Sequence, residues 1–125
     1  MKLGTQKSLE ELKPVLKDPE SIGPDPVYFV FGDVSDPPAG GKWANITMIQ
    51  NGKIGEEYPK TFGHYHSVSV NETYHLLSGE GIFQMVNKNL KEIYLIKAEP
   101  GDEIVITPEF GHSWSNTGNE PLISF

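Results

Sequence analysis

Short strand-like segments recur along most of the chain, and this recurrence constrains the fold more than any other feature of the sequence. From Trp43 onward, runs rich in β-branched and aromatic residues alternate with Gly, Asn or Pro; the runs are "WANITMIQ", "YHSVSV", "ETYHLLS", "GIFQMV", "KEIYLIK", "DEIVI", "HSWSN" and "PLISF". Regularly spaced short strands with turn signals between them are typical of all-β barrels and sandwiches. The turns at Asn51-Gly52 and around Gly79 and Gly81 further predict β-hairpins.

The first 26 residues follow a different pattern and predict an N-terminal extension with one short helix. Ser8 and Glu11 have the spacing of a capping box, and Pro14 limits the length of the helix that follows. Apolar residues recur there at helical spacing: Leu9, Leu12 and Leu16. The run "VYFVF" at 27–31 then predicts a first strand. A chain of 125 residues with 37% hydrophobic residues has the size of one domain, so we expect residues 1–125 to form a single domain.

The composition excludes several classes of site. The chain has no cysteine, which excludes disulfides, thiolate nucleophiles, zinc fingers and iron–sulfur clusters, so any metal must be held by His and carboxylates. The net charge of −7 argues against a nucleic-acid partner. Because all basic residues are Lys, an anionic ligand must be held by backbone N–H groups, hydroxyls, Lys or a metal rather than by Arg. No apolar run approaches the roughly 20 residues of a membrane span, so we expect a cytoplasmic protein without a membrane partner.

Two histidines in one predicted strand form a candidate chelating pair. In "HYHSVSV", His64 and His66 lie two residues apart and project from the same face of the strand. An isolated pair of this kind is more often two half-buried hydrogen-bonding side chains, so other residues must decide. Glu72 and His112 open later strands and can reach the mouth of the same barrel, although alone they have the features of a strand-end acid and a loop histidine. Three imidazoles and one carboxylate suit Fe²⁺, Mn²⁺, Ni²⁺ or Zn²⁺.

The residues around these side chains carry a resemblance to a known family. "GHYH" followed by Glu72 and Gly79, and later "PGDEIVITPEFGHSWSN", resemble the two motifs of the cupin superfamily. More closely, "GKIGEEYPKTFGHYH", "ETYHLLSGEG" and "PEFGHSWSNTGNEP" resemble the cupin-type glucose-6-phosphate isomerases known mainly from archaea. The resemblance runs from about Tyr28 to Phe125. It implies a cupin fold, that is, a double-stranded β-helix or jelly-roll-like barrel, and a homodimeric cytoplasmic enzyme of glycolysis and gluconeogenesis.

The resemblance implies a metal site and a phosphate site. The family's metal ligands fall on four residues of this chain: His64, His66, Glu72 and His112. One divalent metal ion is implied, with Fe²⁺ favoured. Its phosphate-contacting residues fall on Thr47, Thr61, Gly63 and Tyr28. Gly lets a phosphate approach a backbone N–H, and Thr hydroxyls take the place of the missing Arg, although both threonines are also consistent with ordinary strand packing.

The implied reaction is a reversible aldose–ketose interconversion of glucose 6-phosphate and fructose 6-phosphate, which moves a proton between C1 and C2. Glu72 is the expected proton carrier because it is the only carboxylate of the set, and the metal would polarise the sugar oxygens. Tyr74 matches a family tyrosine and faces the same side of its strand as Glu72, so we predict Glu72 and Tyr74 as catalytic residues. A metal-assisted hydride shift is the rival mechanism.

Two other functions remain open on sequence grounds. Family members continue past the strand that matches "PLISF" with a segment carrying a further Tyr and His near the substrate, whereas this chain stops at Phe125. A cupin that binds metal or sugar without turnover is therefore the second hypothesis. A metal-dependent dioxygenase or decarboxylase is the third, because other cupins use the same ligand set. The run "KTFGHYH" and Thr47 favour the isomerase over this third function.

Overall fold

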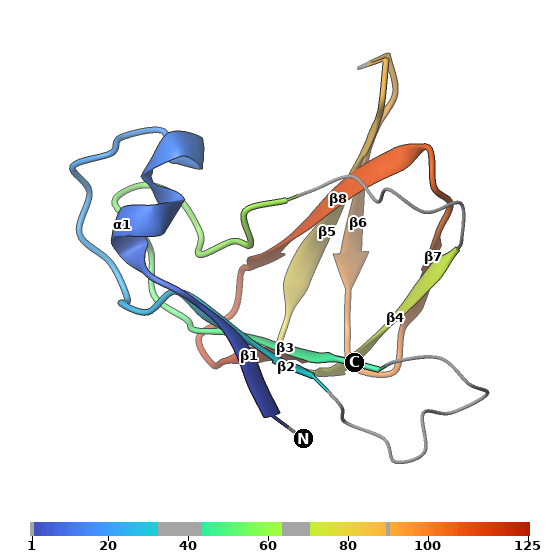
Figure 1. The fold of residues 1–125 in the computed structure, drawn as a ribbon, viewed down its shortest axis with the longest axis horizontal. Helices are drawn as coiled ribbons and strands as arrows, with labels where there is room; N and C mark the ends of the chain where they lie inside the picture. Colours follow the sequence, from blue (N-terminus) through green and yellow to red (C-terminus); the bar gives the residue numbers. More distant parts are fainter. Residues whose placement is uncertain (1, 33–43, 64–70, 90) are drawn as a thin grey trace.

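Two antiparallel β-sheets and one short helix make up the fold (Figure 1). The computed structural model describes residues 2–32, 44–63, 71–89 and 91–125. The elements are β1 (Lys2–Lys7), α1 (Leu9–Leu12), the 3-10 turn η1 (Lys13–Val15), β2 (Tyr28–Gly32), β3 (Ile46–Ile49), β4 (Glu72–Ser78), β5 (Gly81–Asn87), β6 (Ile93–Ala98), β7 (Glu103–Ile106), β8 (Phe110–Asn116) and β9 (Leu122–Ser124). One sheet has the strand order β1-β2-β3-β9-β4-β7 and the other has the order β6-β5-β8. The all-β prediction is confirmed.

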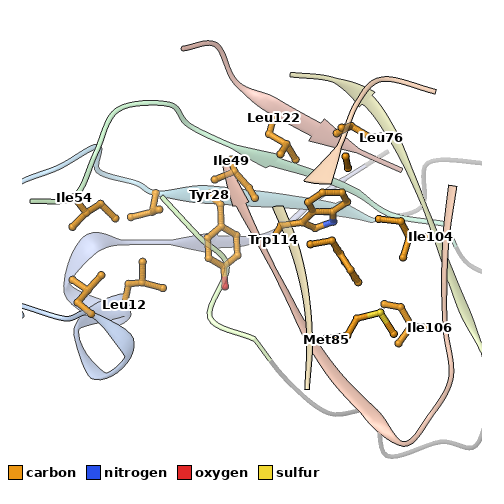
Figure 2. Close-up of a cluster of buried hydrophobic side chains, with 14 residues drawn as sticks. Leu12, Tyr28, Ile49, Ile54, Leu76, Met85, Ile104, Ile106, Trp114 and Leu122 are labelled. Atoms are coloured by element: carbon orange, nitrogen blue, oxygen red, sulfur yellow. The ribbon is translucent and has the colours of Figure 1, made fainter. Parts of the chain in front are cut away.

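Buried hydrophobic side chains from both sheets and from the segments around α1 form one core cluster (Figure 2). In β7, Ile104 and Ile106 are buried while the residues between and before them are exposed, as expected for a strand with one solvated face. Within the three-stranded sheet, Phe83 of β5 packs edge-on against its paired residue Trp114 of β8, with ring centroids 4.7 Å apart. Tyr74 of β4 contacts Phe83 at 5.3 Å and so connects the two sheets. The aromatic cluster therefore fixes the spacing of the sheets beside the predicted site.

The predicted N-terminal helix forms and is capped as the sequence indicates. The Ser8 hydroxyl accepts a hydrogen bond from the Glu11 N–H at 3.1 Å, and the Ser8 N–H donates to the Glu11 carboxylate at 3.3 Å. Pro14 lies in the 3-10 turn that ends the helix after one turn. Before it, β1 was not predicted, because its side chains are mostly exposed and show no apolar alternation. This strand forms by pairing with β2, because the backbone hydrogen bonds between the two strands stabilise it in the absence of a buried side-chain face.

Two predicted hairpins are wrong, although both turns exist. Gly79 has φ +88°, but β4 lies in the six-stranded sheet and β5 in the other, so the turn connects two sheets instead of two paired strands. A Cβ on Gly79 would lie 2.8 Å from the Pro121 carbonyl oxygen, and Gly81 packs equally closely on Leu122. Gly52 has φ +100°, and β3 before it pairs only with β2 and β9 among the described strands. Local turn chemistry specifies a reversal of the chain but not the partner strand.

A buried asparagine holds together three segments near the end of β8. Asn116 is fully buried, and its side-chain amide donates to the Ile49 carbonyl at 3.0 Å and to the Glu120 carbonyl at 2.9 Å. Its side-chain oxygen accepts from the Gly118 N–H at 3.0 Å. These three hydrogen bonds give the side-chain amide the partners that it needs in the interior. They explain its burial, because an unpaired polar group inside a protein is unfavourable.

Candidate functional site

Six predicted site residues come together around one cavity of about 410 Å³. They are Tyr28, Thr47, Thr61, Gly63, Tyr74 and His112. The same cavity is lined by five residues that were not predicted as site residues: Thr5, Lys7, Val30, Phe62 and Trp114. Glu72 lies beside the cavity through its contacts with two of the lining residues, Tyr74 and His112. His64 and His66 lie outside the described residues.

Strand register places one wall of this cavity. Thr5 of β1 is paired with Val30 of β2, which is paired with Thr47 of β3. Directly paired residues of antiparallel strands project to the same face of a sheet, so these three side chains form a row facing the cavity. Lys7 and Tyr28 are paired in the same way and form the next row. The inner face of the first three strands thus carries hydroxyl groups and one ammonium group.

The segment 61–63 also lines the cavity, and it is bonded to β8. The Thr61 N–H donates to the Trp114 carbonyl at 2.9 Å, and the Trp114 N–H donates to the Thr61 hydroxyl oxygen at 3.0 Å. The Phe62 N–H donates to the Tyr28 hydroxyl at 3.2 Å, which joins this segment to β2. The Thr61 hydroxyl keeps its own proton for a ligand, since it acts as an acceptor toward Trp114. Gly63 has φ +88°, which a residue with a side chain adopts only with strain.

Tyr74, His112 and Glu72 form a contiguous polar cluster beside the cavity. The Tyr74 hydroxyl and His112 Nε2 lie 2.8 Å apart and share a hydrogen bond whose direction follows the His112 tautomer. The Tyr74 hydroxyl also lies 3.4 Å from Glu72 Oε2, and Glu72 Oε2 lies 3.7 Å from His112 Nε2. The side chain of His112 is 4% exposed and that of Glu72 is 32% exposed. The Glu72 carboxylate is therefore more exposed than the His112 ring, whereas His112 and Tyr74 line the cavity itself.

The pKa of the Tyr74 phenol is raised well above its ordinary value. Burial is the largest cause, and the charge of Glu72 and the hydrogen bond to it act in the same direction. Tyr74 is thus a neutral hydroxyl at physiological pH, able to donate one hydrogen bond. Packing fixes the position of its partner: the His112 ring stacks on Phe83 at a centroid distance of 5.6 Å and contacts the Tyr74 ring at 5.2 Å.

Two of the four predicted metal ligands can be tested for fit. Glu72 Oε2 and His112 Nε2 are 3.7 Å apart, and metal–ligand bonds of about 2.0–2.2 Å would let one ion contact both atoms. The pair therefore fits a shared divalent ion. Within the described ranges, no group of three or more His, Cys, Asp or Glu side chains is arranged to hold a metal. The other two predicted ligands lie outside those ranges.

The fourth histidine, His75, does not belong to the polar cluster. His75 projects to the opposite side of β4 from Glu72, as alternation predicts, and its side chain is 43% exposed with Nδ1 3.8 Å from the Glu103 carboxylate.

Thr5 and Lys7 were missed because they belong to β1, which was itself not predicted. Their spacing of two residues next to the helix cap is the only signal that could have indicated a shared face.

Comparison with known proteins assigns the family. A family model described as glucose-6-phosphate isomerase matches residues 6–125. The chain belongs to the glucose-6-phosphate isomerase family. It is 34% identical over 101 residues to glucose-6-phosphate isomerase of Thermococcus litoralis, which covers 79% of this chain and 53% of that protein. It is 34% identical over 119 residues to the enzyme of Pyrococcus abyssi, covering 94% and 59% of the two chains. The resemblance to the archaeal cupin-type branch is confirmed.

Length and solved structures set the scope of this family assignment. The chain spans between about half and two thirds of the length of the curated relatives, with 65% as the share for Thermococcus onnurineus, at 31% identity over 125 residues and 94% coverage of this chain. A predicted oxalate decarboxylase from Thermotoga maritima matches with a TM-score of 0.57 at 21% identity, covering 78% of this chain and 75% of that chain. The cupin domain of Drosophila melanogaster CENP-C matches with a TM-score of 0.55 at 14% identity, covering 85% and 73%. These likenesses show the cupin fold.

A search of the described residues for a membrane-crossing helix found none that is both long and apolar enough.

Proposed function

We propose that this family member is a metal-dependent aldose–ketose isomerase that interconverts glucose 6-phosphate and fructose 6-phosphate. The observation that carries the proposal is the convergence of Tyr28, Thr47, Thr61 and Gly63 with Tyr74 on one cavity. These residues come from segments far apart in the sequence, and all five are positions that the family resemblance assigns to the substrate site. Family membership supports the same reaction, since the curated relatives are glucose-6-phosphate isomerases.

The lining of the cavity supports a bound sugar phosphate. The hydroxyls of Thr47 and Thr61 and the backbone of Gly63 offer hydrogen-bond donors suited to a phosphate. Tyr74 and His112 line the same cavity, and Glu72 contacts both of them. We therefore assign the phosphate to the threonines and Gly63, and C1 and C2 of the sugar to the polar cluster.

The three residues of the cluster divide the proton chemistry. Glu72 is the partly exposed carboxylate, and we assign it the removal of the carbon-bound proton and its return to the neighbouring carbon. Tyr74 stays protonated and donates a hydrogen bond that orients the Glu72 carboxylate or stabilises negative charge on a sugar oxygen. The His112 ring packs against the Tyr74 ring at a centroid distance of 5.2 Å and so keeps the Tyr74 side chain in position. The residues thereby hold the carboxylate in place for a transfer between adjacent carbons.

One divalent metal ion completes the proposed site. We propose His64, His66, Glu72 and His112 as its ligands, with Fe²⁺ favoured and Mn²⁺, Ni²⁺ or Zn²⁺ as alternatives for the same nitrogen and oxygen donors. When bound, the ion supplies polarisation of the sugar oxygens as negative charge develops on them. The distance of 3.7 Å between the Glu72 and His112 donor atoms supports this assignment.

An isotope experiment separates proton transfer by Glu72 from a hydride shift. Fructose 6-phosphate is converted in D₂O, and the glucose 6-phosphate is analysed by NMR for deuterium at C2. A carboxylate base that exchanges its proton with solvent introduces deuterium there, whereas a hydride shift retains the original hydrogen. Full retention of hydrogen would overturn the role assigned to Glu72 while leaving the isomerase function in place.

The variant Glu72→Gln tests the site, with Glu103→Gln as the matched control. Glu103 lies on β7 next to β4, but its side chain pairs with His75 on the outer face. We expect Glu72→Gln to lose turnover and Glu103→Gln to keep it, with metal content measured for both. Loss of turnover with retained metal supports proton transfer by Glu72, and loss of both supports metal ligation alone. Wild-type protein that binds fructose 6-phosphate without converting it would establish a non-catalytic binding module instead.

The remaining expectations are proposals of the same kind. The homodimer is tested by the molar mass of the protein in solution. The single domain over residues 1–125 is tested by whether unfolding in urea is one cooperative transition. The solved oxalate decarboxylases add only the fold to the dioxygenase or decarboxylase alternative, because they share 21% identity or less with this chain.

A further inference from the structure

One basic side chain, Lys7, lines the cavity among the residues that the structure describes there. Lys7 is the last residue of β1 and is paired with Tyr28 of β2, so it continues the inner face that carries Thr5. Its ammonium group lies over the ring of Phe62, 5.6 Å from the ring centroid. Phe62 is the residue between Thr61 and Gly63, the two proposed phosphate contacts of that segment. Lys7 therefore reaches from the N-terminal strand across the cavity mouth to the proposed phosphate seat.

The existing partner of Lys7 leaves most of its hydrogen-bonding capacity available. Within the described part of the chain, its one ion pair is with Glu11, at 3.9 Å, at the upper limit for such a contact. Glu11 is itself engaged by Ser8, whose hydroxyl donates to the same carboxylate at 3.0 Å. An ammonium group has three donors, and an exposed pair with one long contact is weak. A phosphate dianion in the cavity would compete effectively for this group.

The positive charge of Lys7 has a specific role in binding a sugar phosphate. The chain carries a net charge of −7, so an approaching sugar phosphate is repelled by the protein as a whole. The proposed phosphate contacts Thr47, Thr61 and Gly63 offer dipoles but no charge. A cation over the same segment offsets the repulsion and forms a charge-assisted hydrogen bond, which a non-phosphorylated sugar cannot make.

We infer that Lys7 is the residue by which this site distinguishes a sugar phosphate from the corresponding free sugar. The inference rests on the proposed function and deepens it, because it assigns phosphate recognition to a residue of β1, a strand that carries none of the predicted site residues. The N-terminal strand is then part of the binding site, and the capped helix directly after it holds Lys7 at the cavity mouth. The phosphate bonds to the Lys7 ammonium on one side and to the Thr61 and Gly63 segment on the other.

The experiment compares Lys7→Gln with wild type, with Lys7→Arg as the charge-retaining variant and Lys17→Gln as the matched control. Lys17 is on the same N-terminal segment, is 70% exposed and pairs with Glu56 away from this cavity. We expect the KM for fructose 6-phosphate to rise about tenfold to hundredfold in Lys7→Gln, the effect of losing one charge-assisted hydrogen bond, with kcat changed far less. Lys7→Arg should recover most of the loss, and Lys17→Gln should stay within about twofold. Thermal melting verifies that each variant is folded.

Calorimetric titration with fructose 6-phosphate and with fructose separates this inference from the proposed function. Wild type should bind the phosphorylated sugar more tightly, and the preference should fall by the same factor in Lys7→Gln. Turnover with a KM that Lys7→Gln leaves unchanged overturns the inference and leaves the isomerase function standing. Absence of turnover with a Lys7-dependent preference for the phosphorylated sugar overturns the isomerase function alone. Equal binding of both sugars by wild type overturns the inference.

Discussion

Replacing Tyr74 by Phe removes one hydroxyl group from the centre of the polar cluster and changes nothing else in size. The ring keeps its contacts with Phe83 at 5.3 Å and with His112 at 5.2 Å. The hydrogen bond lost is the 2.8 Å contact with His112 Nε2, while the 3.4 Å contact with Glu72 is too long to contribute much. A buried hydrogen bond of this length contributes about 1 kcal/mol net, so we expect the free energy of unfolding to fall by about 1–2 kcal/mol.

The chain offers a matched control for this substitution. Tyr94 also donates to a glutamate two residues before it, Glu92, at 3.0 Å, but its side chain is exposed on the edge strand β6. Tyr94→Phe should change stability by less than about 0.5 kcal/mol. Urea unfolding followed by circular dichroism measures both variants. Equal destabilisation by the two substitutions would refute the reasoning that burial makes the Tyr74 hydrogen bond count.

The same variant has a functional prediction, because the hydroxyl of Tyr74 is proposed to stabilise negative charge on a sugar oxygen. We expect kcat for fructose 6-phosphate to fall about tenfold, equivalent to about 1.4 kcal/mol in the activation free energy, with KM within about twofold. Tyr94→Phe should retain the wild-type kcat. An unchanged kcat in Tyr74→Phe would remove this tyrosine from the mechanism.

Three further predictions concern the framework of the site. Gly79→Ala adds a backbone clash to a left-handed φ and should destabilise by about 1–3 kcal/mol more than Gly52→Ala, which has a similar φ and open space around it, as measured by urea unfolding. Asn116→Ala leaves the carbonyls of Ile49 and Glu120 and the Gly118 N–H without this partner and should lower stability by about 3 kcal/mol, whereas an effect below about 1 kcal/mol would contradict that assignment. Hydrogen bonds from Ser8 hold the pKa of Glu11 below its ordinary 4.5. The stabilisation from this cap is therefore present above pH 4.5 and is lost as pH falls through the lowered pKa. NMR of the Glu11 amide should show this transition, and Glu11→Gln should abolish it.

Much of the fold was predictable because the residues of several strands alternate according to which face of the strand is buried. In β5, Phe83 and Met85 alternate with more exposed residues, and in β7 Ile104 and Ile106 do the same. Such a pattern follows from one buried face. In contrast, β1 is mostly exposed and depends on its pairing with β2, so nothing in its side chains indicated a strand. The partner of a strand after a turn is likewise set by the whole sheet, which is why the turn at Gly79 does not form the hairpin that its residues indicate.

The candidate site was also predictable only in part from the sequence. The resemblance selected Thr61 and Gly63 by position, but the bonds that place Thr61 against Trp114 join residues more than 50 positions apart and have no local signal. Lys7 could not be found from the motif, since it reaches the cavity through strand pairing. The proposed metal pair His64 and His66 lies outside the described residues and stays a prediction.

The most direct test of the account is the rate at which the protein converts fructose 6-phosphate to glucose 6-phosphate as its metal is removed and restored. Protein loaded separately with Fe²⁺, Mn²⁺, Ni²⁺ or Zn²⁺ is assayed, treated with a chelator, assayed again and reloaded. The account predicts conversion by the loaded protein, loss of conversion after chelation and recovery on reloading with the same ion. Absence of conversion with all four ions, or conversion that a verified loss of metal leaves unchanged, would contradict it.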